Sequence, residues 1–173
     1  KTEFLYHYRA RHGLPLRERL IAYLPRYAHR LKGAASLMNL RDRVPAFAKL
    51  SEKLLGFTAQ RKLPTWRKDH FKPIVEDAVV AADEKEVVLL VDTFNGCFET
   101  ENAIAAMAVL SAAGYHVHCP SADDRKRPLC FGLTVFRAGV LDEAWVDARR
   151  TLEALAPFGA RGVPVVGLEP SCL

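Results

Sequence analysis

Cysteines beside short turn sequences are the residues of this chain that could do chemistry. The chain has four cysteines, and three of them, Cys97, Cys130 and Cys172, lie at the edge of a candidate strand–loop–helix unit. Thiolates gathered at loop ends are the ligands that an iron–sulfur or zinc site needs. Loop cysteines near helix N-termini also have lowered thiol pKa values, which favours metal ligation. Each cysteine taken alone is more often a small buried hydrophobe, and that alternative stays open.

The elements that must position these cysteines are predicted in the second half of the chain. Residues 87–91 form a continuous aliphatic run, which is typical of a strand buried on both faces. Further strands are expected at 115–119 and 164–168, and helices at about 103–113 and 141–155. This alternation predicts an α/β fold, a Rossmann-like parallel sheet half-domain. Chemistry in such sheets lies at the carboxyl ends of the strands, where we expect the three cysteines to meet.

The first part of the chain is predicted to be an all-α segment, residues 1–56. Apolar residues recur there at helical spacing, Gly13 is expected to end one helix, and Pro25 is expected to kink or end the next. A further short helix is predicted from Pro45 to Leu55.

A basic connector, residues 57–86, is expected between the helices and the α/β unit of residues 87–173. Prolines and a run of charges argue against regular structure in its first part. Trp66 is expected to anchor this connector to the domain.

Charge is distributed unevenly. Residues 1–72 hold 17 Lys and Arg against 5 Asp and Glu, a balance of +12, whereas residues 73–173 hold 8 against 15, a balance of −7. The basic part could meet nucleic acid, an anionic membrane surface or an acidic module of its own protein, or it could simply be solvated. No nucleic-acid recognition motif or interleaved aromatic platform accompanies the charge, so no nucleic-acid partner is expected.

Cysteine usage and hydropathy predict the compartment. Four cysteines without the density of a disulfide scaffold indicate a reducing, cytoplasmic environment. No apolar run reaches the roughly 18 residues that a membrane span needs, so at most a peripheral position at the inner membrane is expected. The chain begins at Lys1 and ends one residue after Cys172, and we expect it to be a fragment of a longer protein.

The cysteine spacing resembles that of the cysteine-rich CCG domain. That family has a cysteine, a long gap, Cys-Cys-Gly, a second gap and Cys-x-x-Cys. Here 32 residues separate Cys97 from Cys130 and 41 separate Cys130 from Cys172. Cys97 matches the first cysteine, Cys130 and Gly132 match Cys-Cys-Gly, and Cys172 matches the last cysteine. The family occurs in heterodisulfide reductases, in the iron–sulfur subunit of glycolate oxidase and in FAD-linked D-2-hydroxy-acid dehydrogenases.

Two flanking segments are similar to the fused dehydrogenases of this family: CFGLT with RAG in residues 130–139, and GVPVVGLEPSC in residues 162–172. The first residues, KTEFL, are similar to the helix that follows the two-cluster ferredoxin module in those proteins. The resemblance implies a parent protein with FAD-binding and ferredoxin modules upstream and a second CCG repeat downstream. This chain would be the first repeat, an electron-transfer module of an oxidoreductase that oxidises a 2-hydroxy acid such as D-lactate or glycolate. It is not expected to be catalytic alone.

The chain departs from the family pattern at two positions. Phe131 stands where the second cysteine of Cys-Cys-Gly belongs, and Glu169 stands where Cys-x-x-Cys would begin. Three thiolates, with Glu169 as an oxygen donor, could hold a [4Fe–4S] cluster, and Gly132 would let the backbone approach it. They could equally hold zinc with an outside ligand, and a cluster-free structural repeat is a third alternative.

Two other features carry weaker hypotheses. His116 and His118 alternate on one face of a predicted strand, a spacing known among metal ligands. With no carboxylate expected nearby, they are predicted to be surface or interface residues. Asp92, at the end of the first strand, is predicted to cap the following turn rather than to act as a general base.

Overall fold

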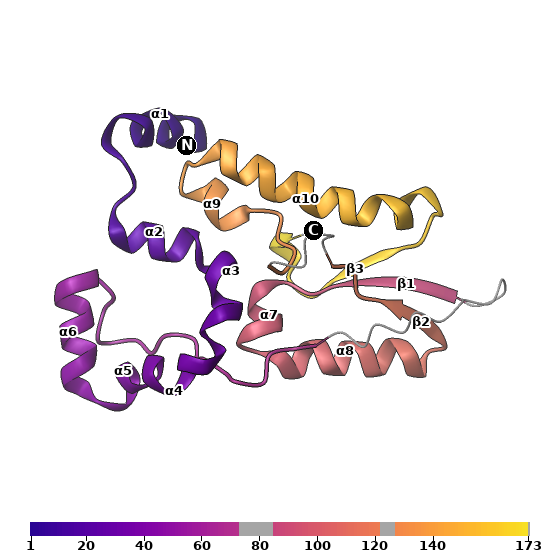
Figure 1. The fold of residues 1–173 in the computed structure, drawn as a ribbon, viewed down its shortest axis with the longest axis horizontal. Helices are drawn as coiled ribbons and strands as arrows, with labels where there is room; N and C mark the ends of the chain where they lie inside the picture. Colours follow the sequence, from indigo (N-terminus) through magenta and orange to yellow (C-terminus); the bar gives the residue numbers. More distant parts are fainter. Residues whose placement is uncertain (73–84, 122–126, 173) are drawn as a thin grey trace.

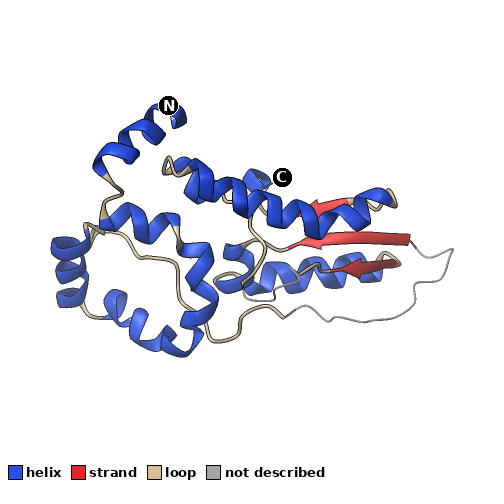
Figure 2. Cartoon of the chain, turned by 45° about the horizontal axis from the view of Figure 1, so that its top comes forward, coloured by secondary structure: helices blue, strands red, loops and turns tan. Residues whose placement is uncertain are grey.

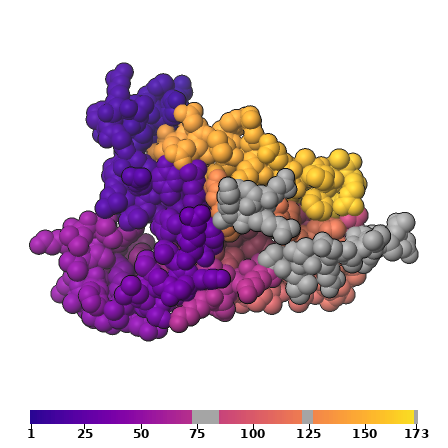
Figure 3. All heavy atoms as spheres, in the orientation of Figure 1, coloured from indigo at the N-terminus to yellow at the C-terminus, as the bar shows by residue number. Residues whose placement is uncertain are grey.

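The chain forms a helical N-terminal region and an α/β unit that lie side by side (Figure 1). The structure is a computed structural model that describes residues 1–72, 85–121 and 127–172, with the side chain of Cys172 outside the description. The space-filling view shows the N-terminal region, indigo to magenta, at one end and the last helix, orange to yellow, against its upper part (Figure 3).

A three-stranded parallel sheet forms the centre of the α/β unit, which confirms the predicted α/β fold. Its order is β2-β1-β3, with β1 at Lys85–Leu90, β2 at Tyr115–His118 and β3 at Val165–Gly167. Val88 of β1 lies opposite His118 of β2 on one side and opposite Val165 of β3 on the other. The predicted burial of the first strand is confirmed, because its last four residues are at most 6% exposed.

Two long helices connect the strands and cover opposite faces of the sheet (Figure 2). They are α8, Thr100–Ala112, and α10, Leu141–Ala160. The sequence predicts both, although α10 continues beyond the expected end and accommodates Pro157 inside its last turns. Two shorter helices were not predicted: α7, Thr93–Cys97, directly after β1, and α9, Leu133–Arg137, directly after the Cys130 loop.

The N-terminal region is helical, as predicted, but more finely divided. Gly13 ends the first helix at a positive φ of 71°, and the second helix stops before Pro25, which becomes the second residue of the next. The elements are α1 Thr2–His12, α2 Leu16–Ala22, α3 Leu24–Tyr27, the 3₁₀ helix η1 Ala28–Ala34, α4 Ala35–Met38, α5 Leu40–Arg43 and α6 Pro45–Leu55.

The two regions are joined by a polar contact between α3 and α10. The Arg26 guanidinium donates to the buried Asp147 carboxylate at 3.0 Å and also pairs with Glu143. Tyr23 donates its hydroxyl to Glu143 at 2.7 Å. Next to this contact, the Thr134 hydroxyl of α9 donates to the Ala22 carbonyl at 2.7 Å. Burial of a paired charge at this point fixes how the helical region sits on the α/β unit.

The connector has no regular secondary structure over residues 57–72, as predicted for its first part. Trp66 is an anchor: its backbone exchanges two hydrogen bonds with the Asn39 side chain, at 2.7 and 2.8 Å, and its ring packs edge-on against Phe98. The Phe71 amide then donates to the Gly96 carbonyl at 2.9 Å, beside α7. The predicted end of the connector is wrong, since Lys85 and Glu86 already pair with β2. Residues 73–84 lie outside the described part.

Over the three described ranges, no helix is both long enough and apolar enough to cross a bilayer.

Candidate functional site

The candidate site lies at the carboxyl edge of the sheet, where three chain segments with cysteines emerge. Cys97 ends α7 just after β1, and Cys172 lies in the 3₁₀ helix η2, Pro170–Cys172, just after β3. Cys130 lies on a loop whose Leu129 packs against Leu90 at the end of β1. The backbone therefore brings the three predicted positions to one edge of the sheet, while the thiol of Cys172 lies outside the described residues.

Cys130 and Cys97 line two different cavities at this edge. The Cys130 cavity has a volume of about 230 Å³ and combines apolar walls with a few polar groups. The second, the Cys97 cavity, also has a volume of about 230 Å³. Asp92 and Thr93 at the start of α7 line both, so the beginning of this helix forms the partition between them.

The Cys130 cavity contains two of the predicted site residues. The thiol-bearing Cys130 and the carboxylate-bearing Glu169 both line it, together with Arg137 and Ser171. Glu169 accepts hydrogen bonds from the Ser171 hydroxyl at 2.7 Å and the Ser171 amide at 3.3 Å. These bonds lower the pKa of Glu169, so it is a carboxylate at neutral pH and could serve as an oxygen donor.

The loop that holds Cys130 is fixed by contacts with α10. The Cys130 carbonyl lies 3.0 Å from the buried Thr151 hydroxyl. Arg150 donates to the carbonyls of Arg127 and Pro128, and the Arg127 side chain pairs with Asp147. Because these contacts come from one rigid helix, Cys130 is held in place without any ligand.

Gly132 has a packing role that differs from its predicted one. Its φ is +75°, and a Cβ there would lie 2.9 Å from the Ala144 carbonyl oxygen and 3.1 Å from Asp147 Cβ. The close backbone approach is therefore toward α10, and Gly132 does not line either cavity. Its amide lies 3.4 Å from Cys130 Sγ, a weak hydrogen bond to the thiol.

Cys97 lies on the other side of the partition. Its side chain is 4% exposed and belongs to an apolar cluster with Ala28 and Phe98, against which Leu24 and Trp66 pack. It lines the Cys97 cavity together with Cys119, His29 and His70. Cys97 therefore shares a cavity with Cys119, the fourth cysteine of the chain, and not with Cys130.

The expectation of lowered thiol pKa values is wrong for the cysteines whose side chains are described. Burial raises the pKa of Cys97 to about 11, with a further contribution from the Asp92 carboxylate, and burial raises the pKa of Cys119 to about 11. Burial also raises the pKa of Cys130. The physical reason at Cys97 is burial, which disfavours the charged thiolate, and Cys97 lies at the end of α7 rather than at a helix N-terminus.

Asp92 caps α7, as predicted. One carboxylate oxygen accepts from the amides of Phe94 at 2.8 Å and Asn95 at 3.2 Å, and the other accepts from the Asn95 side chain. The Asn95 oxygen in turn accepts from Asn102 of α8 at 2.9 Å. This network orients the partition between the two cavities. Next to Asp92, the Thr93 hydroxyl is buried and has no hydrogen-bond partner among the described residues.

The donor set fits a metal group only in part. Among the described residues, no three His, Cys, Asp or Glu side chains are placed to hold a metal ion together. A group bound in the Cys130 cavity would take Cys130 and Glu169 from the described donors, whereas Cys97 faces the neighbouring cavity. The contribution of Cys172 lies outside the description.

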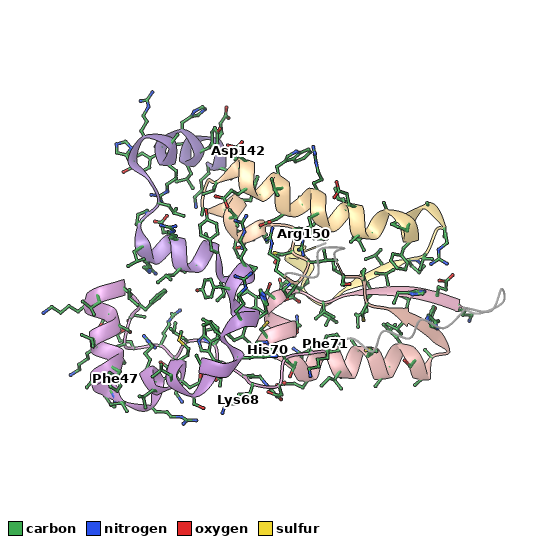
Figure 4. The ribbon with its side chains drawn as sticks, viewed as in Figure 1. Phe47, Lys68, His70, Phe71, Asp142 and Arg150 are labelled. Atoms are coloured by element: carbon green, nitrogen blue, oxygen red, sulfur yellow. The ribbon has the colours of Figure 1, made fainter. Side chains whose placement is uncertain are left out.

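Sequence reasoning missed Cys119 and the two histidines of the Cys97 cavity. Cys119 directly follows β2, so the rule that directed attention to the strand ends applies to it as well. His29 and His70 come from η1 and the connector, and no local pattern connects them to the sheet edge. Figure 4 shows His70 and Phe71 beside α7.

The histidine pair of β2 lies away from both cavities. His118 Nε2 is 2.6 Å from the Glu86 carboxylate, which Arg161 also contacts at 2.9 Å. The expectation that no carboxylate is near these histidines is therefore wrong, because the neighbouring strand supplies one. The contact with Glu86, which itself forms an ion pair with Arg161, gives His118 a structural role.

Comparisons with protein families, with curated proteins and with solved structures found no match for this chain.

Proposed function

We propose that this chain is an electron-transfer module of an FAD-linked oxidoreductase that oxidises a 2-hydroxy acid such as D-lactate or glycolate. The observation that carries the proposal is the convergence of the segments bearing Cys97, Cys130 and Cys172 at the carboxyl edge of a parallel sheet. The resemblance of the cysteine spacing to the CCG domain supplies the chemical class.

Cys130 and Glu169 are the side chains that would bind a metal group in this module. They line the same cavity, and α10 fixes the Cys130 loop before anything binds. Burial keeps the Cys130 thiol protonated at neutral pH, so binding must release this proton. A bound [4Fe–4S] cluster would accept and pass on single electrons. Phe131, Pro25 and Leu133 would keep water from the buried side of the group.

The remaining modules of the parent protein would supply the other functions. FAD and the substrate would be bound outside this chain, and the basic N-terminal region would meet a ferredoxin module or an anionic membrane surface. A second CCG repeat would cover the free edge of β3. What favours such a partner is the exposure of this edge strand, whose Val165 and Val166 are 37% and 38% exposed.

A second candidate function is that of a cluster-free structural repeat within the same kind of oxidoreductase. The burial of Cys97 favours it, since the thiol packs with Ala28 and Phe98 as a small hydrophobe. In that case the cysteines contribute packing, and the cavity beside Cys130 remains an apolar gap filled by a partner.

Anaerobic reconstitution of the 173-residue chain with iron and sulfide, followed by EPR and metal analysis, tests the proposal. We expect bound iron with a cluster signal that is lost in Cys130→Ala and Cys172→Ala and weakened in Glu169→Ala. Cys119→Ala is the matched control, because Cys119 is also a partly buried free thiol but does not line the Cys130 cavity. Co-purified zinc in place of iron indicates a zinc module. Absence of both metals, with unchanged folding after Cys130→Ala, refutes both and favours the structural repeat.

A further inference from the structure

The outer part of the N-terminal region is a strongly basic lobe, which we define as residues 28–64. It contains eight Lys and Arg residues against Asp42 and Glu52, a net charge of +6. Among the described residues, the lobe forms a single ion pair, between Arg41 and Asp42. Most of its positive charge is thus left for an external partner, in contrast to Arg26 of α3, which is neutralised by α10.

An exposed apolar stripe runs along the last helix of this lobe. On α6, Phe47, Leu50 and Leu54 are 45%, 48% and 66% exposed. Positions i, i+3 and i+7 share one face of a helix, so these side chains form a continuous row. Lys49 and Lys53 are exposed on the same helix, whereas the buried Ala48 faces inward. Figure 4 labels Phe47 on α6, at the end of the molecule away from the sheet.

The orientation of this stripe is fixed by Arg41 of α5. Its Nε donates to the Ser51 hydroxyl of α6 at 2.9 Å, and its terminal nitrogens donate to the carbonyls of Phe57 and Thr58 at 3.2 and 2.6 Å. Gly56 ends the helix in a left-handed conformation with φ 73°. These contacts hold α6 and the segment after it on α5. The apolar row therefore cannot turn inward without breaking them.

We propose that this face of α6 binds an anionic lipid surface, with Phe47, Leu50 and Leu54 entering the headgroup region and Lys49 and Lys53 contacting lipid phosphates. An interfacial helix needs one apolar face that enters the bilayer by about 5–10 Å, flanked by lysines. Lysine stems can lie along the apolar boundary while their ammonium groups reach the phosphates. The positive charge of the lobe attracts it to the negative surface.

The same features disfavour a protein as the occupant. A specific protein interface buries roughly 800 Å² on each partner, and an 11-residue helix exposing three apolar side chains offers much less. This proposal rests on the membrane contact in the proposed function and assigns that contact to the exposed face of α6. It does not depend on a metal group, so lipid binding and cluster loading can fail separately.

Vesicle co-sedimentation of the 173-residue chain tests this inference. We expect binding to vesicles of phosphatidylcholine with phosphatidylglycerol, no measurable binding to phosphatidylcholine alone, and release by added salt. Leu54→Gln should weaken binding about tenfold, and Lys53→Gln roughly fivefold. A Phe47→Trp variant should show a blue-shifted emission in a background where both native tryptophans are replaced by phenylalanine.

Matched controls come from the acidic part of the chain. Val109 of α8 is 67% exposed, close to the 66% of Leu54, and Arg149 of α10 is an exposed cation. Val109→Gln and Arg149→Gln should leave vesicle binding unchanged. The proposal is refuted if the chain does not bind anionic vesicles, or if the control variants weaken binding as much as the α6 variants. It is also refuted if Leu54→Gln instead dissociates a dimer detected by light scattering.

Discussion

The Cys130 cavity and the Cys97 cavity have equal volumes of about 230 Å³ and share a partition, but their walls come from different parts of the chain. The first is enclosed mainly by the α/β unit, and it combines Cys130 with the charged groups Arg137 and Glu169. The second is closed by η1 and the connector, which bring His29 and His70 to the same cavity as the buried Cys97 and the partly buried Cys119.

This difference shows that a short helix directly after a strand can separate a cysteine from the other cysteines of its sequence motif. Cys97 follows β1 as the pattern requires, but the turns of α7 carry it across the partition and into the apolar cluster with Phe98. Cys130 lies on an irregular loop, and its position is set by hydrogen bonds to α10 instead. Two cysteines at the same sheet edge thus have different environments: one is packed, and the other is held beside a cavity.

Removal of the Asp147 carboxylate should have the largest effect on the Cys130 side. Asp147 is 3% exposed and pairs with both Arg26 and Arg127, so Asp147→Ala leaves Arg127 without its ion-pair partner and leaves Arg26 with Glu143 alone. We expect the free energy of unfolding, measured with urea, to fall by about 3–5 kcal/mol.

Asp142→Ala is the matched control for that change. Asp142 is exposed on the same helix, where it accepts a long hydrogen bond of 3.4 Å from Tyr6 (Figure 4). Its loss should change stability by less than about 0.5 kcal/mol. Equal effects of the two variants would mean that the contact at Asp147 does not support the Cys130 loop.

The next largest effect should come from Gly132→Ala, which tests how closely the Cys130 loop lies on α10. A Cβ would overlap the Ala144 backbone, and the residue would also have to keep φ at +75°. We expect a loss of about 2–4 kcal/mol in the free energy of unfolding. Gly162→Ala, with φ +71° and no atom within 4 Å of the added Cβ, isolates the backbone cost at about 1 kcal/mol. Similar losses for both would contradict the close approach.

The sequence was sufficient to predict the elements that have a strong local pattern. The buried strand β1, the helix α8 and the helix ending at Gly56 follow from hydrophobic periodicity and helix stop signals. The capping role of Asp92 and the anchoring role of Trp66 follow from local chemistry and are confirmed.

What the sequence could not predict depends on tertiary contacts. The five residues of α7 are too few for a periodic signal, so the rotation of Cys97 away from Cys130 had no local signature. The contact between His118 and Glu86 depends on the strand register, and the place of His70 in the Cys97 cavity depends on the path of the connector. The raised thiol pKa values follow from burial, which is a property of the folded state.

An alkaline pH titration would sharpen the contrast on the Cys97 side. The pKa of Cys97 is raised from an ordinary value of 9.0 to about 11, mainly by burial. Above about pH 9 the thiol loses its proton in the unfolded chain but keeps it in the folded chain. The stability contributed by the protonated thiol is therefore fully present below pH 9 and is lost as the pH approaches 11. Relative to Cys97→Ala, the wild type should lose on the order of 2 kcal/mol over this interval.

The measurement is urea unfolding of both proteins under reducing conditions at several pH values from about 7 to about 11. Comparison with Cys97→Ala cancels the titration of Cys119 and of the other alkaline groups, because these are present in both proteins. Parallel curves over the whole range would show that the Cys97 thiol is not in a buried apolar environment.

The smallest effect, about 1 kcal/mol, is expected for Thr151→Val, and it probes the Cys130 loop directly. Valine keeps the shape of the side chain but removes the hydroxyl that lies 3.0 Å from the Cys130 carbonyl. In a background where Cys97, Cys119 and Cys172 are alanine, the alkylation rate of Cys130 should rise about fivefold, because the loop opens more often. Thr134→Val removes a comparable hydrogen bond, to the Ala22 carbonyl at 2.7 Å, outside this loop. It should lower stability similarly but leave the alkylation rate unchanged; an equal rise in both variants would mean that Cys130 is exposed by global unfolding rather than held by α10.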